Sequence, residues 1–260
     1  MAEITITNSQ GIRLRSNVYT PIGWDTGHDQ DSAGNTTTSN ESGNNAVVAV
    51  SYSGYGGGTY SIYRVALDFD LSGITAGSTI NSAKLKLYGA SATSPHFTVT
   101  VVEADFIVLQ GTFTDGSTLD AATYNDFSGH GSGWDGTDSG VIEYSGEEAS
   151  SWSTSGYNEV TLNADCLSDI TSRAGSSTRL ACYIIEHDHD YHDNINGENG
   201  NAVNSLYDVY KVNFNINPSA TNPPQLVVDY TEPDVEPTAT FGINFNDGSL
   251  SSNGGDITIK

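Results

Sequence analysis

The densest group of potential metal ligands in this sequence lies between residues 186 and 194. The segment reads Glu-His-Asp-His-Asp-Tyr-His-Asp-Asn and follows an apolar run over residues 179–185. Closely spaced carboxylates suit Ca²⁺, whereas three histidines suit Zn²⁺ or another transition metal. If the segment binds Ca²⁺, the expected ligands are Glu186, Asp188, Asp190, Asp193 and Asn194. Because acidic turns are common in acidic chains, a solvated strand end without any metal stays open as an alternative, as does a transition-metal site.

The period of a strand makes a further prediction about this segment. If the strand continued past residue 185, His187 and His189 would share one face and the acidic side chains would lie on the other. A weaker cluster of the same kind, Asp25, His28, Asp29 and Asp31, lies in a long polar stretch near the N-terminus.

Aromatic residues in or beside polar loops are the candidates for binding glycans. An exposed aromatic ring can stack on the C–H face of a sugar, while neighbouring Asp and Asn side chains hydrogen-bond its hydroxyls. The candidates are Trp24, Trp134, Trp152, Tyr55 and Tyr191. The alternative for each is a core or loop anchor, which is where large aromatic residues usually lie.

Motifs that carry a catalytic mechanism are missing from the sequence. It contains no G-x-S-x-G elbow and no H-E-x-x-H helix, and the Gly-rich run 54–58 lacks the Lys-Ser/Thr of a phosphate-binding loop. We therefore expect that the protein is not an enzyme.

Composition and charge exclude several classes of protein. The 260 residues include 32 acidic and 9 basic side chains, for a formal charge of −23. Such a chain repels phosphate backbones and anionic lipids, so we expect no nucleic-acid partner. No apolar run approaches the roughly 18–20 residues of a membrane span, so no membrane insertion is expected. Residues 1–10 have neither a basic start nor an apolar middle, so no signal peptide is expected.

The two cysteines, Cys166 and Cys182, both lie in apolar surroundings. One pair in a chain of this size is not a disulfide scaffold. We expect two buried free thiols, with a single disulfide as the alternative.

The elements that position these residues follow from a hydrophobic period of two. Alternating or apolar segments predict strands over residues 4–7, 46–52, 62–69, 83–87, 97–101, 141–144, 159–162, 179–186, 209–216 and 225–230. Short helices are expected over 163–173, with Asn163 as N-cap and Gly175 as the stop, and over 119–127. The expected fold is all-β: an antiparallel β-sandwich or jelly roll with one or two short crossover helices.

The domain organisation follows from where the prolines fall. Five of the seven prolines come after residue 217. We expect a β-sandwich domain over 1–231, an acidic Pro linker over 232–237 and, over 238–260, a C-terminal extended arm. The arm's alternating apolar residues Phe241, Ile243 and Phe245 are expected to contact a neighbouring subunit, because so short a segment cannot bury a core of its own. The start of a further domain is the alternative.

Residues 64–88 read RVALDFDLSGITAGSTINSAKLKLY, and residues 223–231 read PPQLVVDYT. The first segment resembles the strand–turn–strand pattern of the DNRLRE family of β-sandwich modules, and the second resembles the closing strand of that family. The turn Glu186-His-Asp188 is similar to a G-H-D turn of related sequences. The resemblance covers residues 10–231 and implies a carbohydrate-binding-module-like sandwich of the kind found in phage structural and bacterial surface proteins. It also implies polysaccharides such as alginate as ligands, although a chain of charge −23 suits a polyanion poorly unless Ca²⁺ bridges the two.

Alternation within the first of these segments makes two structural predictions. Leu67, Phe69 and Leu71 should point into the core, while Asp68 and Asp70 point the other way. Arg64, one of few basic groups, is expected to pair with a carboxylate.

These observations lead to two expectations about function. The first is a non-catalytic structural protein at the virion surface: a capsid decoration, tail or fibre component that contacts other subunits, forms a homo-oligomer and adheres to surface glycans. The second is a carbohydrate-binding module of a secreted bacterial protein at the cell surface or outside the cell. We expect no cofactor, and bound Ca²⁺ stays open as the alternative.

Overall fold

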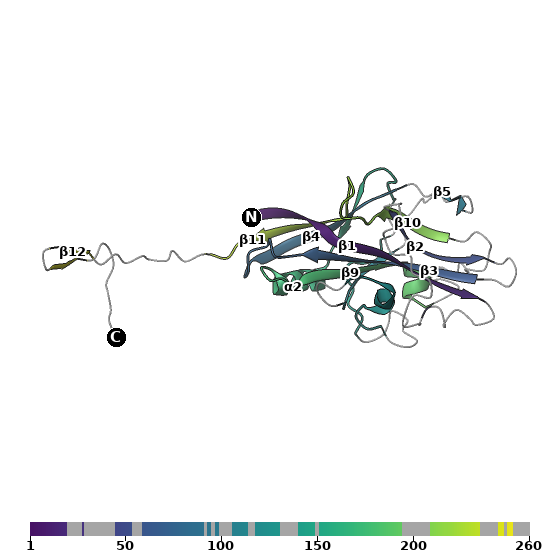
Figure 1. The fold of residues 1–260 in the computed structure, drawn as a ribbon, viewed down its shortest axis with the longest axis horizontal. Helices are drawn as coiled ribbons and strands as arrows, with labels where there is room; N and C mark the ends of the chain where they lie inside the picture. Colours follow the sequence, from purple (N-terminus) through teal and green to yellow (C-terminus); the bar gives the residue numbers. More distant parts are fainter. Residues whose placement is uncertain are drawn as a thin grey trace.

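A computed structural model describes residues 1–19, 28, 45–53, 59–90, 93–94, 97–98, 106–113, 118–130, 140–148, 151–193, 209–234, 244–246 and 249–251. These residues form an antiparallel β-sandwich with short helical segments, so the all-β fold class is confirmed (Figure 1). No helix among them is long and apolar enough to cross a membrane.

The first strand of the chain belongs to both layers of the sandwich. Residues 2–7 of β1 (Ala2–Tyr19) pair with β11, and residues 8–19 pair with β3. The register shifts between Asn8 and Gln10, where a bulge bends the strand from one sheet into the other. The first sheet has the order β1-β11-β4-β8, with β11 (Gln225–Thr231), β4 (Thr79–Tyr88) and β8 (Tyr157–Thr161).

The second sheet is centred on β3 (Thr59–Asp70). One edge of β3 pairs with β1, and the other pairs first with β2 (Asn45–Ser53) and then with β9 (Arg179–Ile185). Beyond these lie β10 (Val209–Asn215), paired with β2, and β7 (Ile107–Gln110), paired with β9. The predicted strand over 141–144 is wrong: Glu143 makes an isolated bridge to Leu109, and the chain turns where the N–H groups of Tyr144 and Ser145 both donate to the carbonyl of Val108.

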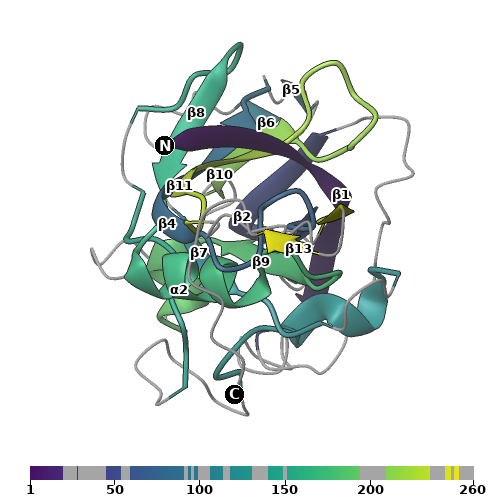
Figure 2. The ribbon, with the colours of Figure 1, turned by 90° about the vertical axis from the view of Figure 1, so that its left-hand side faces the viewer.

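The main hydrophobic core lies between the two sheets. As predicted from alternation, Leu67, Phe69 and Leu71 are buried in it, while Asp68 faces the other side. The helix α2 (Ala164–Arg173) packs against β4 and β9 and buries Cys166 and Ile170 in the same core (Figure 2). The side chain of Asn163 caps its N-terminus, so the predicted helix is confirmed with its cap.

A second core covers the outer face of the β3 sheet. It contains Ile62 and Ala66 of β3, which alternate with the residues of the main core. Two short helical turns supply its outer layer: the 3-10 helix η1 (Ala121–Asn125), within the predicted helix 119–127, and the π-helical turn η2 (His187–Tyr191). Arg64 points to this side of the sheet and therefore lies beneath both turns.

The remaining described strands form two small sheets. β5 (Thr93–Ser94) pairs with β6 (Phe97–Thr98), and β12 (Asn244–Asn246) pairs with β13 (Ser249–Ser251). Neither of the last two strands pairs with a strand of the sandwich; β12 is at the left of Figure 1. Phe245 of the expected arm lies in β12, whereas Phe241 and Ile243 lie outside the described residues.

Candidate functional site

The segment 186–193 does not continue β9 as a strand, which corrects the predicted alternation of His187 and His189. Glu186 ends the strand and begins the π-helical turn η2, because its Oε2 accepts hydrogen bonds from the backbone N–H groups of His189 and Asp190, each at 2.8 Å. Its Oε1 lies 2.8 Å from Nδ1 of His189. All three side chains are buried. The buried Glu186 side chain therefore stabilises the turn η2 by hydrogen bonds to the backbone of that turn.

Asp190 pairs with Arg64 across the second core. The guanidinium Nε and Nη2 donate to the Asp190 carboxylate at 2.6–3.2 Å, and both side chains are fully buried. Nη1 donates to the side chain of Asn125 in η1, and the ring of Tyr124 lies 4.3 Å from the guanidinium carbon. Burial, the largest single effect, lowers the pKa of Arg64, but the charge and hydrogen bonds of Asp190, together with Tyr124 and Tyr183, outweigh burial and raise that pKa above its ordinary value. The predicted pairing of Arg64 with a carboxylate is confirmed.

His28 joins the same group from the N-terminal part of the chain. Its Nε2 lies 2.6 Å from the carbonyl oxygen of Asp190, and its Nδ1 lies 3.2 Å from Oδ1 of Asp193. Asp193 has a φ of 46°, a left-handed conformation in which it closes the turn after η2. The two acidic and histidine-rich clusters of the sequence thus meet at His28. Asp25, Asp29 and Asp31 lie outside the described residues.

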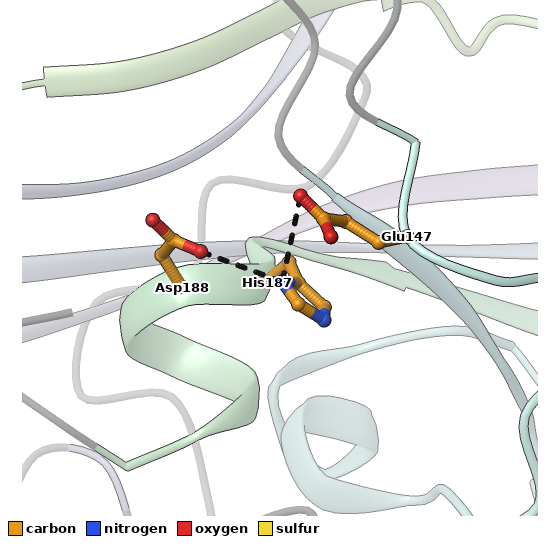
Figure 3. A group of neighbouring side chains, drawn as sticks. All are labelled: Glu147, His187 and Asp188. Carbon is orange, nitrogen blue, oxygen red and sulfur yellow. Dashed lines mark ion pairs between the residues drawn. The ribbon is translucent and has the colours of Figure 1, made fainter. Parts of the chain in front are cut away.

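A third group contains Glu147, His187 and Asp188 (Figure 3). Nδ1 of His187 lies 3.5 Å from Oδ1 of Asp188 and 4.0 Å from Oε1 of Glu147. His187 and Asp188 are 7% and 4% exposed. The Glu147 side chain is 42% exposed and approaches from the segment that follows Tyr144.

The structure therefore divides the expected Ca²⁺ ligands among three sets of contacts. Glu186 accepts hydrogen bonds from its own turn, Asp190 and Asp193 contact Arg64 and His28, and Asp188 faces His187 and Glu147. Asn194 lies outside the described residues. Glu147 was missed by the sequence analysis because it lies 40 residues before His187 in a Gly-Glu-Glu segment without any metal-binding spacing.

Two of the expected glycan-binding aromatics are buried, which corrects their assignment. Trp152 is 8% exposed, lies edge-on to Phe106 with centroids 5.6 Å apart, and donates its indole N–H to the carbonyl of Asn213. Tyr191 is 4% exposed, stacks on His187 and donates its hydroxyl to Glu143. Neither ring offers a face to a sugar. Trp24, Trp134 and Tyr55 lie outside the described residues.

The two cysteines are free and buried, as expected. Burial raises the pKa of both thiols, and their mutual proximity adds to this effect for Cys166. Since the thiolate is the nucleophilic form, neither cysteine is suited to nucleophilic chemistry in the folded protein.

Comparison of the chain with models of protein families finds no matching family, and comparison with curated proteins finds no match.

Proposed function

We propose that this chain is a non-catalytic structural protein of a virion, a capsid decoration, tail or fibre component, in which the β-sandwich is the rigid body and the C-terminal arm joins a neighbouring subunit. The observation that carries the proposal is the hairpin of β12 and β13. It forms a sheet of its own, with Phe245 opposite Leu250. Two strands of three residues each are too short to be stable alone in water, which supports a role for this segment in contacting a partner surface.

The polar network of the sandwich agrees with a structural role. The buried groups Arg64, Asp190 and Glu186 bind one another or the backbone of the turns and hold η1, η2 and β3 together. A buried polar network of this kind rigidifies the segments that it joins.

The family assignment is part of this proposal. The residues that resemble the DNRLRE family form β3, the following turn, β4 and β11, at the centre of the sandwich. The resemblance favours a surface-exposed module of a phage or bacterium, with adhesion to polysaccharide as an additional property. The burial of Trp152 and Tyr191 makes an isolated carbohydrate-binding module the weaker alternative.

The test measures self-association of the full chain and of a chain lacking residues 232–260, by light scattering and native mass spectrometry. We expect the full chain to form a repeated complex and the shortened chain to be monomeric, with the melting temperature of the sandwich unchanged because its last strand ends at Thr231.

A pair of point variants tests whether an apolar residue of the arm, and not the deletion as such, controls association. Phe245→Asp should abolish association, whereas Asn246→Ser, at the next position of the same strand, should not. A full chain that is monomeric, or a shortened chain that still associates, would contradict the structural role. A monomer retained on polysaccharide gels would indicate the binding module instead.

A further inference from the structure

Glu147, His187 and Asp188 form a group whose geometry suits a metal ion (Figure 3). One ligand atom from each residue, an imidazole nitrogen and two carboxylate oxygens, lies within 4.8 Å of the other two. The sidechains come from two separate segments, the 145–148 segment and η2. In Figure 3 one ring nitrogen of His187 faces both carboxylates, while the other points away from them.

The distances in this group are longer than those of direct hydrogen bonds. Nδ1 of His187 lies 3.5 Å from Asp188 and 4.0 Å from Glu147, whereas N–H···O bonds are usually about 2.7–3.2 Å. Two ligands on one tetrahedral ion, each bonded at about 2.0–2.1 Å, lie about 3.4 Å apart. Asp188 already has this spacing from His187. Glu147, whose side chain is 42% exposed, has to move about half an ångström closer to His187 to reach this spacing from the imidazole.

The charges of the group favour a cation. The buried carboxylate of Asp188, a residue that is 4% exposed, and the 42% exposed carboxylate of Glu147 converge on His187, and like charges brought close together repel each other. In a chain of net charge −23 the surrounding field also concentrates cations at the surface. A divalent ion between the two carboxylates would remove their repulsion.

We propose that Glu147, His187 and Asp188 bind a divalent transition-metal ion of the Zn²⁺ class. The imidazole nitrogen decides the class, because Ca²⁺ takes six to eight oxygen ligands and imidazole suits Zn²⁺ and its neighbours. Nδ1 of His187 and one oxygen each of Glu147 and Asp188 are the protein ligands, with water in the open position. Tyr191 stacks on the His187 ring with the planes 17° apart and holds its orientation.

Bound metal would join the 145–148 segment to the turn η2. Both segments flank β7 and β9, since Tyr144 and Ser145 donate to Val108 of β7 and η2 follows β9. An ion that binds only the folded state stabilises it by mass action. The bound ion therefore has a structural role, because it stabilises the fold by joining two segments on the outer face of the sandwich. This role is independent of the C-terminal arm.

The test titrates Zn²⁺ into the metal-free full chain by calorimetry and follows the melting temperature with Zn²⁺ and with EDTA. We expect one tight equivalent of Zn²⁺, a higher melting temperature with Zn²⁺, and no displacement by millimolar Ca²⁺. Glu147→Gln should weaken binding by about tenfold or more, because it removes a ligand charge from an exposed side chain without disturbing the core. Glu3→Gln, which removes an exposed carboxylate of the first sheet, is the matched control and should bind as the parent does.

Three outcomes would overturn the proposal. The first is an affinity for Zn²⁺ no higher than that of ordinary surface carboxylates. The second is a Glu147→Gln variant whose affinity for Zn²⁺ is unchanged, and the third is displacement of Zn²⁺ by Ca²⁺. Asp188→Asn, checked for folding by circular dichroism, provides a second variant that should lose the same equivalent of Zn²⁺.

Discussion

The guanidinium of Arg64 and the carboxylate of Asp190 form a two-point ion pair, with contacts at 2.6–3.2 Å and no exposure of either side chain. The pair joins the central strand β3 to the turn η2, 126 residues later in the chain. Nη1 of the same arginine donates to Asn125, and Nη2 donates to the carbonyl of His28. One buried cation therefore contacts η1, η2 and His28 on the outer face of the sheet.

Removing one partner of this pair should destabilise the protein strongly. Arg64→Met leaves Asp190 buried without its cation, and Asp190→Asn leaves Arg64 without its counter-charge, so each should lower the free energy of unfolding by about 3–5 kcal/mol. The double variant should cost less than the sum of the two, because neither uncompensated charge remains. Urea unfolding measures all three.

The exposed pair of Lys84 and Glu159, joined at 2.8 Å, is the control for this experiment. Lys84→Met should change the free energy of unfolding little, since exposed ion pairs contribute little to stability. If Arg64→Met were as mild as Lys84→Met, Arg64 would not be the centre of the second core.

Asp169 of α2 should make stability depend on pH in the acid range. Although burial favours the neutral acid, hydrogen bonds from Arg173, Tyr144 and Gln110 lower the pKa of Asp169 below its ordinary value of 3.8. The unfolded chain then binds the proton more tightly than the folded chain, so stability rises with pH. This contribution is complete above the unfolded value and is lost as the pH falls through the lower folded value.

Asp169→Asn should therefore be less stable than the parent near neutral pH, and the gap in melting temperature should narrow below about pH 4. Thermal unfolding followed by circular dichroism from neutral to acid pH measures this gap. A gap that stays constant over the whole range would show that the charge of Asp169 is not responsible.

Both thiols should be unreactive in the folded protein. Cys166 and Cys182 are free and fully buried, and burial raises the pKa of each, which suppresses the reactive thiolate. A chromogenic disulfide reagent should label neither thiol under native conditions and both in denaturant. Cys166→Ala should halve the denatured signal, and rapid labelling of the native parent would refute this prediction.

Gly175 should tolerate no side chain. It has a φ of 72° directly after the C-cap of α2, and an added Cβ would lie 2.7 Å from the backbone nitrogen and Cβ of Ala76. Gly175→Ala should lower the free energy of unfolding by about 1–3 kcal/mol, because an L-residue with a side chain is strained in this conformation. Gly146→Ala, where no atom lies within 4 Å of the added Cβ, is the matched control and should leave stability nearly unchanged. Equal effects at the two glycines would contradict the prediction.

Local rules accounted for the elements of this fold. A period of two along residues 62–69 placed Leu67 and Phe69 in the core and Asp68 on the opposite face, because successive side chains of a strand alternate. Asn163 and Gly175 marked the ends of α2 through cap chemistry that involves only neighbouring backbone. The scarcity of basic residues also indicated that Arg64 pairs with a carboxylate, although not with which one.

The partners of the polar residues were decided by the tertiary structure alone. Glu147 and His187 are 40 residues apart, and His28 and Asp190 are separated by 162, so no spacing in the sequence connects them. Contacts between residues remote in sequence also explain the error at 186–193, where strand alternation was extended past Ile185. Glu186 turns the chain by accepting two backbone N–H groups, and buried contacts with Arg64 and His28 hold that turn in place. The sequence by itself determined the strands and their inward faces, since these depend on neighbours along the chain. Which carboxylate meets which cation depended on the packing of both cores, since that packing sets the distances between segments remote in sequence.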